Sequence, residues 1–153
     1  MRVLGIDYGD KYVGLALSDP TGLIASPLKT IFRSEEANLK ATVREIRALC
    51  EQEDIHTLVL GLPLNMDDTE GPRCEKSRAF KKRLERDLYQ VEVILWDERL
   101  TTCEAEEPLF QLGFDRRKRK EVVDKIAAAL ILQNWLDAQR EKKPAEPSGG
   151  EQV

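Results

Sequence analysis

The chain is poor in the residues that zinc sites and nucleophilic triads need. It has one histidine, His56, and three widely spaced cysteines without a CxxC pair, namely Cys50, Cys74 and Cys103. This pattern indicates neither a disulfide framework nor a thiolate zinc site, so we expect reduced thiols. A single histidine excludes the HExxH metalloproteases and leaves Ser-His-Asp and Cys-His triads little support. We expect His56 at the surface, where a strand starts.

Long apolar runs are also absent. The opening segment MRVLGIDYG carries one basic residue and too short an apolar stretch for a signal peptide, and no later segment could span a bilayer. We therefore expect a cytoplasmic protein with no membrane partner. With 41% hydrophobic and 34% charged residues, 153 residues suit one folded domain, since a domain usually has about 100 to 200 residues.

The chain has no excess of positive charge. Its formal net charge of -4 is unlike that of a protein that coats nucleic acid non-specifically, so a nucleic-acid site would have to be a local basic patch. Carboxylates are abundant instead. They are the ligands that hard ions such as Mg²⁺ and Mn²⁺ prefer, which makes an all-oxygen metal site the most accessible chemistry for this composition.

The hydrophobic pattern predicts a layered α/β domain over residues 1–142. Three short strands with tight connections form an antiparallel meander, and strand-helix repeats follow, an order typical of a mixed sheet covered by helices. The expected strands are residues 2–6, 12–17, 23–30, 56–62 and 91–96. The expected helices are residues 34–53, with Ser34 as N-cap, and 73–88, 101–112 and 122–139. Residues 143–153 hold two prolines and two glycines and are expected to form a flexible tail.

Two carboxylate positions follow apolar strands. Asp7 lies at the carboxyl end of the first strand, where open α/β sheets place their ligand crevices, although turn stabilisation is the commoner role of an isolated aspartate. Asp97 and Glu98 repeat the arrangement after the apolar run VILW. Since side chains alternate along a strand, only one of the two can point into a crevice beside Asp7, and we take Glu98 as the candidate. A salt bridge to Arg99 would explain Glu98 equally well.

A third carboxylate, Asp124, is expected in the first turn of the last helix. A carboxylate there interacts favourably with the helix dipole, which is a sufficient structural explanation. The small side chains of Ala127 and Ala128 would, however, let the helix pack close to the sheet and carry Asp124 toward the strand ends. If Asp7, Glu98 and Asp124 meet, they form an oxygen site for one or two Mg²⁺ or Mn²⁺ ions around a phosphate.

Four blocks lie in order over about residues 2–136, namely GIDYGDKYVGLALSD, GLPLNMDDTEGP, DERLTT and VDKIAAALILQNWL. Together they resemble the YqgF family of Holliday-junction resolvases, also described as pre-16S ribosomal RNA nucleases, which has a ribonuclease-H-like fold. The resemblance implies a five-stranded mixed sheet and a metal-dependent nuclease that acts on structured nucleic acid. It also implies that Asp7, Glu98 and Asp124 are the catalytic, metal-binding acids.

The resemblance places the loop of residues 61–72 near the site. Asn65 and Thr69 of this loop could contact phosphate or a metal-bound water, or the loop could simply be a turn shaped by proline and glycine. Two departures from the family pattern stand out. Asp68 occupies a position that is usually glycine, which adopts positive φ more readily. Tyr12-Val13 replace a basic residue followed by isoleucine, which could remove a phosphate contact.

Two basic clusters are candidate nucleic-acid surfaces. The first, expected as a loop directly before the helix with Asp124, is the run Arg116, Arg117, Lys118, Arg119 and Lys120, and it could guide a phosphate backbone to the metals. The second, on the helix 73–88, comprises Arg73, Lys76, Arg78, Lys81, Lys82, Arg83 and Arg86. The same helix carries Glu75, Glu85 and Asp87, and such mixed charge usually marks a solvated face. We therefore favour the first cluster.

Two other functions are compatible with parts of the sequence. A GIDxG strand followed by a hairpin also opens sugar-kinase and actin-like ATPase domains, but these bind nucleotide between two domains and the chain supplies about one. A non-catalytic nucleic-acid-binding factor in transcription or translation is disfavoured by the presence of all three acids. The sequence leaves precursor rRNA and branched DNA open as substrates. It also leaves monomer and homodimer open, because junction resolution needs two symmetric cuts and RNA trimming needs one.

Overall fold

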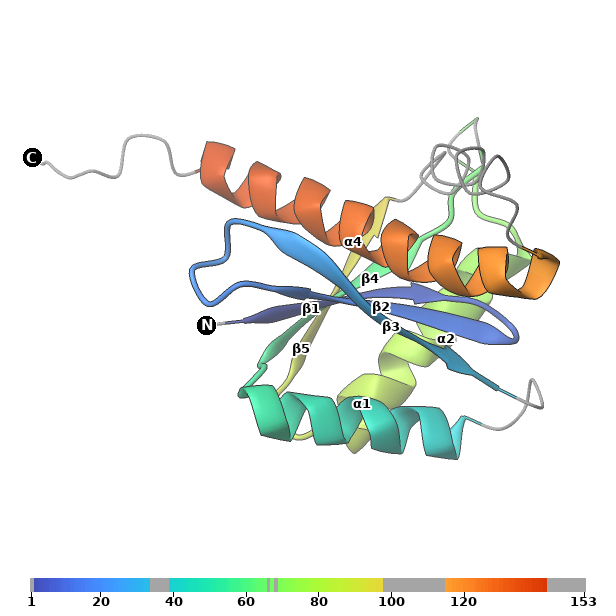
Figure 1. Ribbon diagram of the computed structural model, residues 1–153, viewed down its shortest axis with the longest axis horizontal. Coiled ribbons are helices and arrows are strands. Elements are labelled where there is room, and N and C mark those ends of the chain that lie inside the picture. Colours follow the sequence, from blue (N-terminus) through green and yellow to red (C-terminus); the bar gives the residue numbers. More distant parts are fainter. Residues whose placement is uncertain (1, 34–38, 66, 68, 98–114, 143–153) are drawn as a thin grey trace, which may run out of the picture.

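A five-stranded mixed sheet forms the centre of the molecule (Figure 1). The computed structural model describes residues 2–33, 39–65, 67, 69–97 and 115–142. The sheet has the order β3-β2-β1-β4-β5, in which β1, β2 and β3 are antiparallel neighbours and β4 and β5 run parallel to β1. The strands are β1 Val3–Tyr8, β2 Tyr12–Ser18, β3 Ala25–Phe32, β4 Thr57–Leu62 and β5 Glu92–Asp97. The predicted α/β fold, a five-stranded mixed sheet with an antiparallel meander followed by strand-helix repeats, is confirmed.

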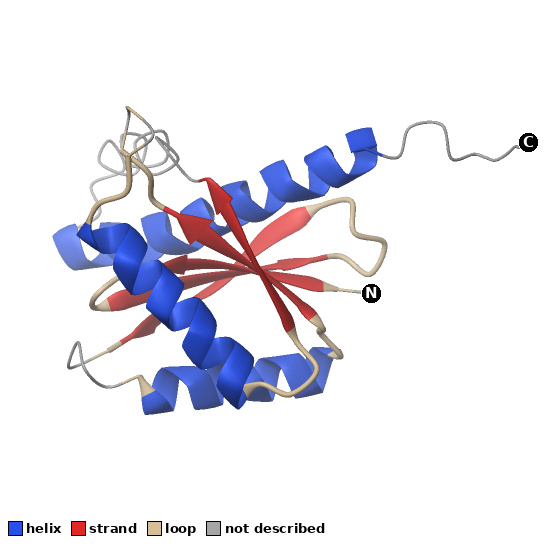
Figure 2. Cartoon of the chain, turned by 180° about the vertical axis from the view of Figure 1, so that it is seen from behind, coloured by secondary structure: helices blue, strands red, loops and turns tan. Residues whose placement is uncertain are grey.

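Helices cover both faces of the sheet. They are α1 Lys40–Glu53, α2 Pro72–Asp87 and α4 Arg116–Lys142. Helix α4 lies along one face, and α1 and α2 lie on the other, where Figure 2 shows α2 crossing the sheet. Within the described residues, none of these helices is long and apolar enough to cross a membrane. The expected helix 101–112, the N-cap Ser34 and the tail 143–153 lie outside the described residues.

The basic run differs from its prediction as a loop, because residues 116–120 form the first turns of α4. Asp115 explains the early start: its Oδ1 accepts a hydrogen bond of 2.8 Å from the Lys118 N–H, and its carbonyl oxygen accepts one of 2.8 Å from the Arg119 N–H. Arginine and lysine are also good helix formers, which a reading of charge alone overlooks. Asp124 therefore lies roughly two turns into the helix, beyond the reach of the terminal dipole, and the dipole explanation of this residue is wrong.

Strand alternation divides the apolar side chains between two cores. Leu4 and Ile6 of β1 pack on the side of α1 and α2, in a cluster that includes Ile46 and Phe80. Val3 of β1 packs on the side of α4 with Val59, Ala128, Ile131 and Leu132. Each fully buried Leu, Ile or Phe stabilises the fold by about 1.5 to 3 kcal/mol. Because successive side chains alternate, Asp7 shares the α4 face with Val3.

Two glycines allow α4 to lie almost directly on the sheet. A Cβ at Gly5 would lie 2.7 Å from Leu132 Cβ and 2.8 Å from the Ala128 carbonyl oxygen. The approach is closer at Gly14, where a Cβ would lie 2.0 Å from the carbonyl oxygen of Asp124. The buried Ala128 contributes a small side chain to the same contact, as expected. The absence of a side chain at Gly14 thus sets how near the third turn of α4 comes to β2.

We predict that Gly14→Ala lowers the free energy of unfolding by about 1 to 3 kcal/mol, because the added methyl group must push the α4 backbone away from β2. Gly71→Ala is the matched control, since a Cβ at Gly71 would meet only Asn65 side-chain atoms at 3.7 Å and 3.9 Å. The control should cost less than about 1 kcal/mol. Urea-induced unfolding measures both values, and equal stabilities for the two variants would contradict the close approach.

Candidate active site

Asp7 and Asp124 come together where β1 ends. Asp7 is 7% exposed and pairs in register with Gly14 of β2. The backbone of Asp124 lies directly over Gly14, and the Asp124 side chain is buried. Helix α4 therefore places this carboxylate beside the strand that bears Asp7. Both residues line the same cavity. Two of the three predicted acids therefore lie in one site although they are far apart in the chain.

The cavity that these carboxylates line has a volume of about 510 Å³. The tight turn between β1 and β2 forms one wall, and α2 and α4 contribute basic side chains to the others. Its lining is Asp7, Tyr8, Gly9, Asp10, Lys11, Tyr12, Arg73, Lys76, Lys120 and Asp124. Four cationic side chains thus surround three acidic ones. The site combines an acidic floor with a basic rim.

Asp124 is held in an electrostatically costly position. Its Oδ1 lies 3.1 Å from the Lys120 Nζ, whereas its buried Oδ2 has no hydrogen-bond partner among the described residues. Burial raises the pKa of Asp124 to about 6, an effect opposed by the Lys120 charge and reinforced by the negative charge of Asp7. A buried carboxylate with an unpaired oxygen destabilises a fold unless some group satisfies that oxygen.

The raised pKa gives a stability prediction. Between pH 3.8 and about 6 the folded protein holds the Asp124 proton more tightly than the unfolded chain, so ionisation destabilises the fold as the pH rises and the full cost is present above about pH 6. In EDTA, Asp124→Asn should therefore be more stable than wild type at pH 7, by on the order of 2 to 3 kcal/mol. The difference should shrink toward zero near pH 4.

Urea unfolding at a series of pH values measures this difference. Asp137→Asn is the control on the same helix, because the Asp137 side chain is only half-buried and pairs with Arg140. The raised pKa of Asp124 would be contradicted if wild type were more stable than Asp124→Asn at pH 7. It would also be contradicted if the difference in unfolding free energy did not change with pH.

The third predicted acid, Glu98, lies outside the described residues. Asp97, the other member of the pair, ends β5, in which Val93 and Leu95 pack on the α1 and α2 side. By alternation Asp97 belongs to that side of the sheet, opposite to Asp7. The alternation of β5 therefore gives no reason to prefer Asp97 over Glu98 as the partner of Asp7. The role of Glu98 stays a prediction.

Asn65 and Thr69 do not line the cavity and instead pair with each other. The Asn65 Nδ2 donates to the Thr69 Oγ1 at 2.9 Å, and the Asn65 N–H donates to the Thr69 carbonyl oxygen at 2.9 Å. The Thr69 Oγ1 also donates to Asp67 Oδ1 at 2.6 Å. These bonds close the loop on itself at the carboxyl end of β4, so a contact with phosphate stays a prediction for both side chains. Asp68 lies outside the described residues.

The cations at the cavity come from both basic clusters. Of the run 116–120, Lys120 lines the cavity, while the guanidinium of Arg117 lies over the ring of Phe32. Lys118 is exposed and Arg119 partly exposed, and the side chain of Arg116 lies outside the described set. The second cluster contributes Arg73 and Lys76 from the first turns of α2.

Their position directly after the loop at the carboxyl end of β4 is the signal that could have singled out these two residues from the sequence. Other members of the second cluster form ion pairs, as expected for a solvated face: Arg78 with Glu70, Lys81 with Glu85, and Arg83 and Arg86 with Asp87.

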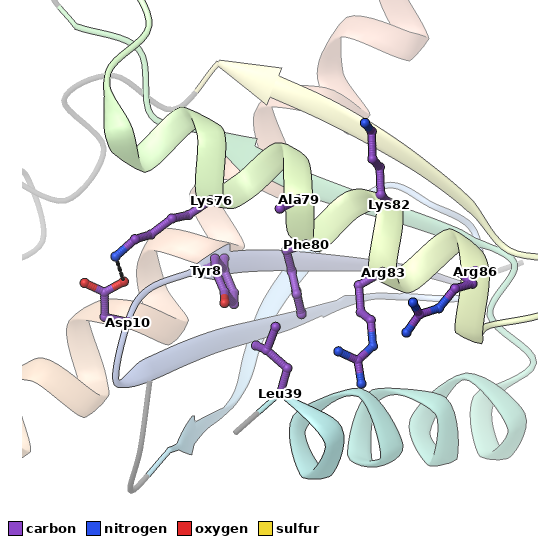
Figure 3. A pocket seen from close by; sticks show the side chains of 9 residues that line it. All are labelled: Tyr8, Asp10, Leu39, Lys76, Ala79, Phe80, Lys82, Arg83 and Arg86. Atoms are coloured by element: carbon purple, nitrogen blue, oxygen red, sulfur yellow. Dashed lines mark hydrogen bonds and ion pairs between the residues drawn. The ribbon is translucent and has the colours of Figure 1, made fainter. Parts of the chain in front are cut away.

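A buried arginine that the sequence analysis missed supports the turn at the cavity wall. Arg33 is 3% exposed, and its Nε donates to the Asp10 carbonyl oxygen at 3.0 Å and its Nη1 to the Tyr8 hydroxyl at 3.0 Å. Lys76 Nζ lies 2.9 Å from Asp10 Oδ1, an ion pair drawn in Figure 3. A second cavity of about 460 Å³ lies beside α2. Tyr8, Asp10 and Lys76 line both this cavity and the one that holds Asp7 and Asp124, so the ion pair lies where the two cavities adjoin.

Comparison with known proteins places this chain in a family. The model of the RuvX family, described as Holliday junction resolvase, matches residues 1–138. The chain belongs to the RuvX family. A relative from Syntrophus aciditrophicus (strain SB) is 48% identical over 147 residues, 95% of each chain, and one from Clostridium tetani is 46% identical over 138 residues, 90% of this chain and 97% of the other. Both relatives carry the name "Putative pre-16S rRNA nuclease".

A solved structure supports the fold. The Thermus thermophilus RuvC structure in complex with a Holliday junction substrate matches with a TM-score of 0.50 and 17% identity, over 91% of this chain and 95% of that one. The predicted YqgF resemblance and the ribonuclease-H-like fold are confirmed. As a member of the RuvX family the chain is a nuclease, a hydrolase of phosphodiester bonds, which decides against the sugar-kinase and actin-like reading.

Proposed function

We propose that this RuvX-family chain cleaves precursor rRNA or branched DNA with Mg²⁺ or Mn²⁺ held by Asp7 and Asp124, and with Glu98 as a further ligand. One observation carries the proposal. Two buried carboxylates share a cavity at the carboxyl end of the parallel strands, beneath a rim of four cations. The acids suit a metal and the cations suit phosphates, so the cavity matches both parts of a metal-dependent phosphodiester hydrolase.

The residues present fit a hard cation. Mg²⁺ is usually bound by one or two carboxylates, with waters and substrate phosphate oxygens completing its coordination. Asp7 and Asp124 supply such a pair. The buried Oδ2 of Asp124 has no hydrogen-bond partner among the described residues, so a cation could satisfy it. A cation between the two would also offset their mutual repulsion. Among the described residues no group of three or more His, Cys, Asp or Glu side chains is placed to hold a metal, so the third ligand rests on Glu98.

A bound Mg²⁺ would stabilise the charge that develops on the phosphate and lower the pKa of an attacking water. The chain's own residues perform the other tasks. Lys120 is half exposed and lies at the Asp124 carboxylate, within reach of a phosphate brought to the same place. Arg73 and Lys76 approach from α2 and would fix the strand on the opposite wall. At neutral pH Asp124 is ionised and able to bind metal, and below about pH 6 protonation competes with the metal.

The precursor of 16S rRNA is the first substrate to test, because both relatives described above are named for it. Branched DNA is the second, because the family model is described as a junction resolvase. A junction requires two symmetric cuts and hence two active sites, whereas trimming an RNA end requires one. Sedimentation of the protein with each substrate therefore accompanies the cleavage assay.

We predict that wild type cleaves at least one of these substrates with Mg²⁺ or Mn²⁺, and that Asp7→Asn and Asp124→Asn each reduce the single-turnover rate by at least about 100-fold. Asp137→Asn should cleave at the wild-type rate, because this half-buried residue of α4 does not line the cavity. Denaturing gels of end-labelled RNA and of a four-way DNA junction give the rates. Undiminished cleavage by Asp7→Asn would refute the metal-carboxylate mechanism. Tight binding without cleavage in either metal would instead favour a non-catalytic nucleic-acid-binding factor.

A further inference from the structure

An aromatic pair lies beside the register row of Asp7, Gly14 and Thr30, on the same face of the sheet. Tyr12 lines the cavity and pairs in register with Phe32 of the edge strand β3. Registered partners project to the same face, and Tyr12 lies two residues before Gly14, so both rings belong to the face that α4 covers. Their ring centroids are 5.3 Å apart at an interplanar angle of 53°. The cavity thus leads directly from the carboxylates to an aromatic surface.

Helix α4 extends from Gly14 of β2 to the Phe32 ring of β3. Arg117, Lys120 and Asp124 follow one another at spacings of three and four and therefore share one face of the helix. Asp124 lies over Gly14, Lys120 lines the cavity, and the Arg117 Cζ lies 5.3 Å from the centroid of the Phe32 ring. A guanidinium plane and two aromatic rings therefore adjoin the phosphate-binding cations.

Packing does not account for the position of Phe32. Its side chain is 48% exposed even with Arg117 above it. The contact between β3 and α4 is made by other groups, since the Thr30 hydroxyl donates to the carbonyl oxygen of Glu121. The neighbouring Ile31 is buried and anchors this end of the strand in the opposite core. Phe32 is therefore available to a ligand without loss of the fold.

We propose that Tyr12, Phe32 and Arg117 form a stacking platform for one unpaired nucleobase of the strand whose phosphate reaches Asp7 and Asp124. Bases released from a duplex stack on aromatic rings and guanidinium planes, whereas paired bases hide these surfaces within the helix. The Arg117 charge would at the same time contact the adjoining phosphate. This inference rests on the proposed function and narrows its substrate to nucleic acid with an unpaired nucleotide beside the bond that is cut.

The test compares two ligands of the same duplex length, one blunt and one with a short single-stranded overhang. Their affinities for the full-length protein are measured by fluorescence anisotropy in EDTA, so that no strand is cut. Phe32→Ala should weaken binding of the overhang ligand about tenfold and leave the blunt duplex within about twofold. Phe32→Trp, which retains a stacking surface, should restore the wild-type difference between the two ligands.

Two control variants separate stacking from general effects. Tyr89→Ala removes an aromatic residue that is 89% exposed, does not line the cavity, and lies between α2 and β5, the edge strand opposite to β3. It should bind both ligands as wild type does. Lys118→Ala removes one charge from the same helical turn as Arg117 and should weaken both ligands alike, whereas Arg117→Ala should weaken the overhang ligand more.

Each outcome has one meaning. If Phe32→Ala binds both ligands as wild type does, or loses affinity for both equally, the platform is overturned. The nuclease proposal then remains in place. Wild type that binds neither ligand, and cleaves none of the substrates above, removes the proposed function and the platform with it. If wild type sediments as a dimer and Phe32→Ala as a monomer, the rings bind a second copy of the chain. This result would also overturn the platform.

Discussion

The contact between α4 and β2 at Gly14 is the constraint on which the site depends. A methyl group at this position would lie 2.0 Å from the carbonyl oxygen of Asp124, so the helix reaches its place only because the strand has no side chain there. The same contact buries the Asp124 carboxylate beside Asp7 and raises its pKa to about 6. The fold thus bears an electrostatic cost at neutral pH, as functional sites commonly do, and a bound cation would offset it.

Local charge at the cavity contrasts with the charge of the chain. The protein is acidic overall, with a formal net charge of -4, yet Lys11, Arg73, Lys76 and Lys120 gather at the rim of one cavity. Most other cations of α2 are paired with carboxylates on the same helix or next to it. The cations at the rim would attract a phosphate backbone to this cavity, which favours specific over non-specific binding.

The sequence predicted the sheet well because short apolar runs bounded by turn residues leave a clear local pattern, and the strands VLGIDY and TLVLGL are indeed buried almost throughout. It misplaced the start of α4, since the basic run masked the cap formed by Asp115. Asp7 and Asp124 were singled out, but their meeting depends on Gly14, a tertiary contact with no local signature. Arg73 and Lys76 were undervalued because the mixed charge of their helix hid the signal of their position after β4, whereas the exposed Phe32 was missed because its neighbours across the fold cannot be read from spacing. Glu98 lies outside the described residues and stays a prediction.

The most direct test of the account is calorimetric titration of the protein with Mn²⁺ near pH 7.5, where Asp124 is ionised. Wild type should bind the ion, and Asp7→Asn and Asp124→Asn should each lose at least about tenfold in affinity, because both carboxylates contact the same cation. Asp137→Asn should bind as wild type does. Equal Mn²⁺ affinity in wild type and in either site variant would contradict the claim that Asp7 and Asp124 form one metal site.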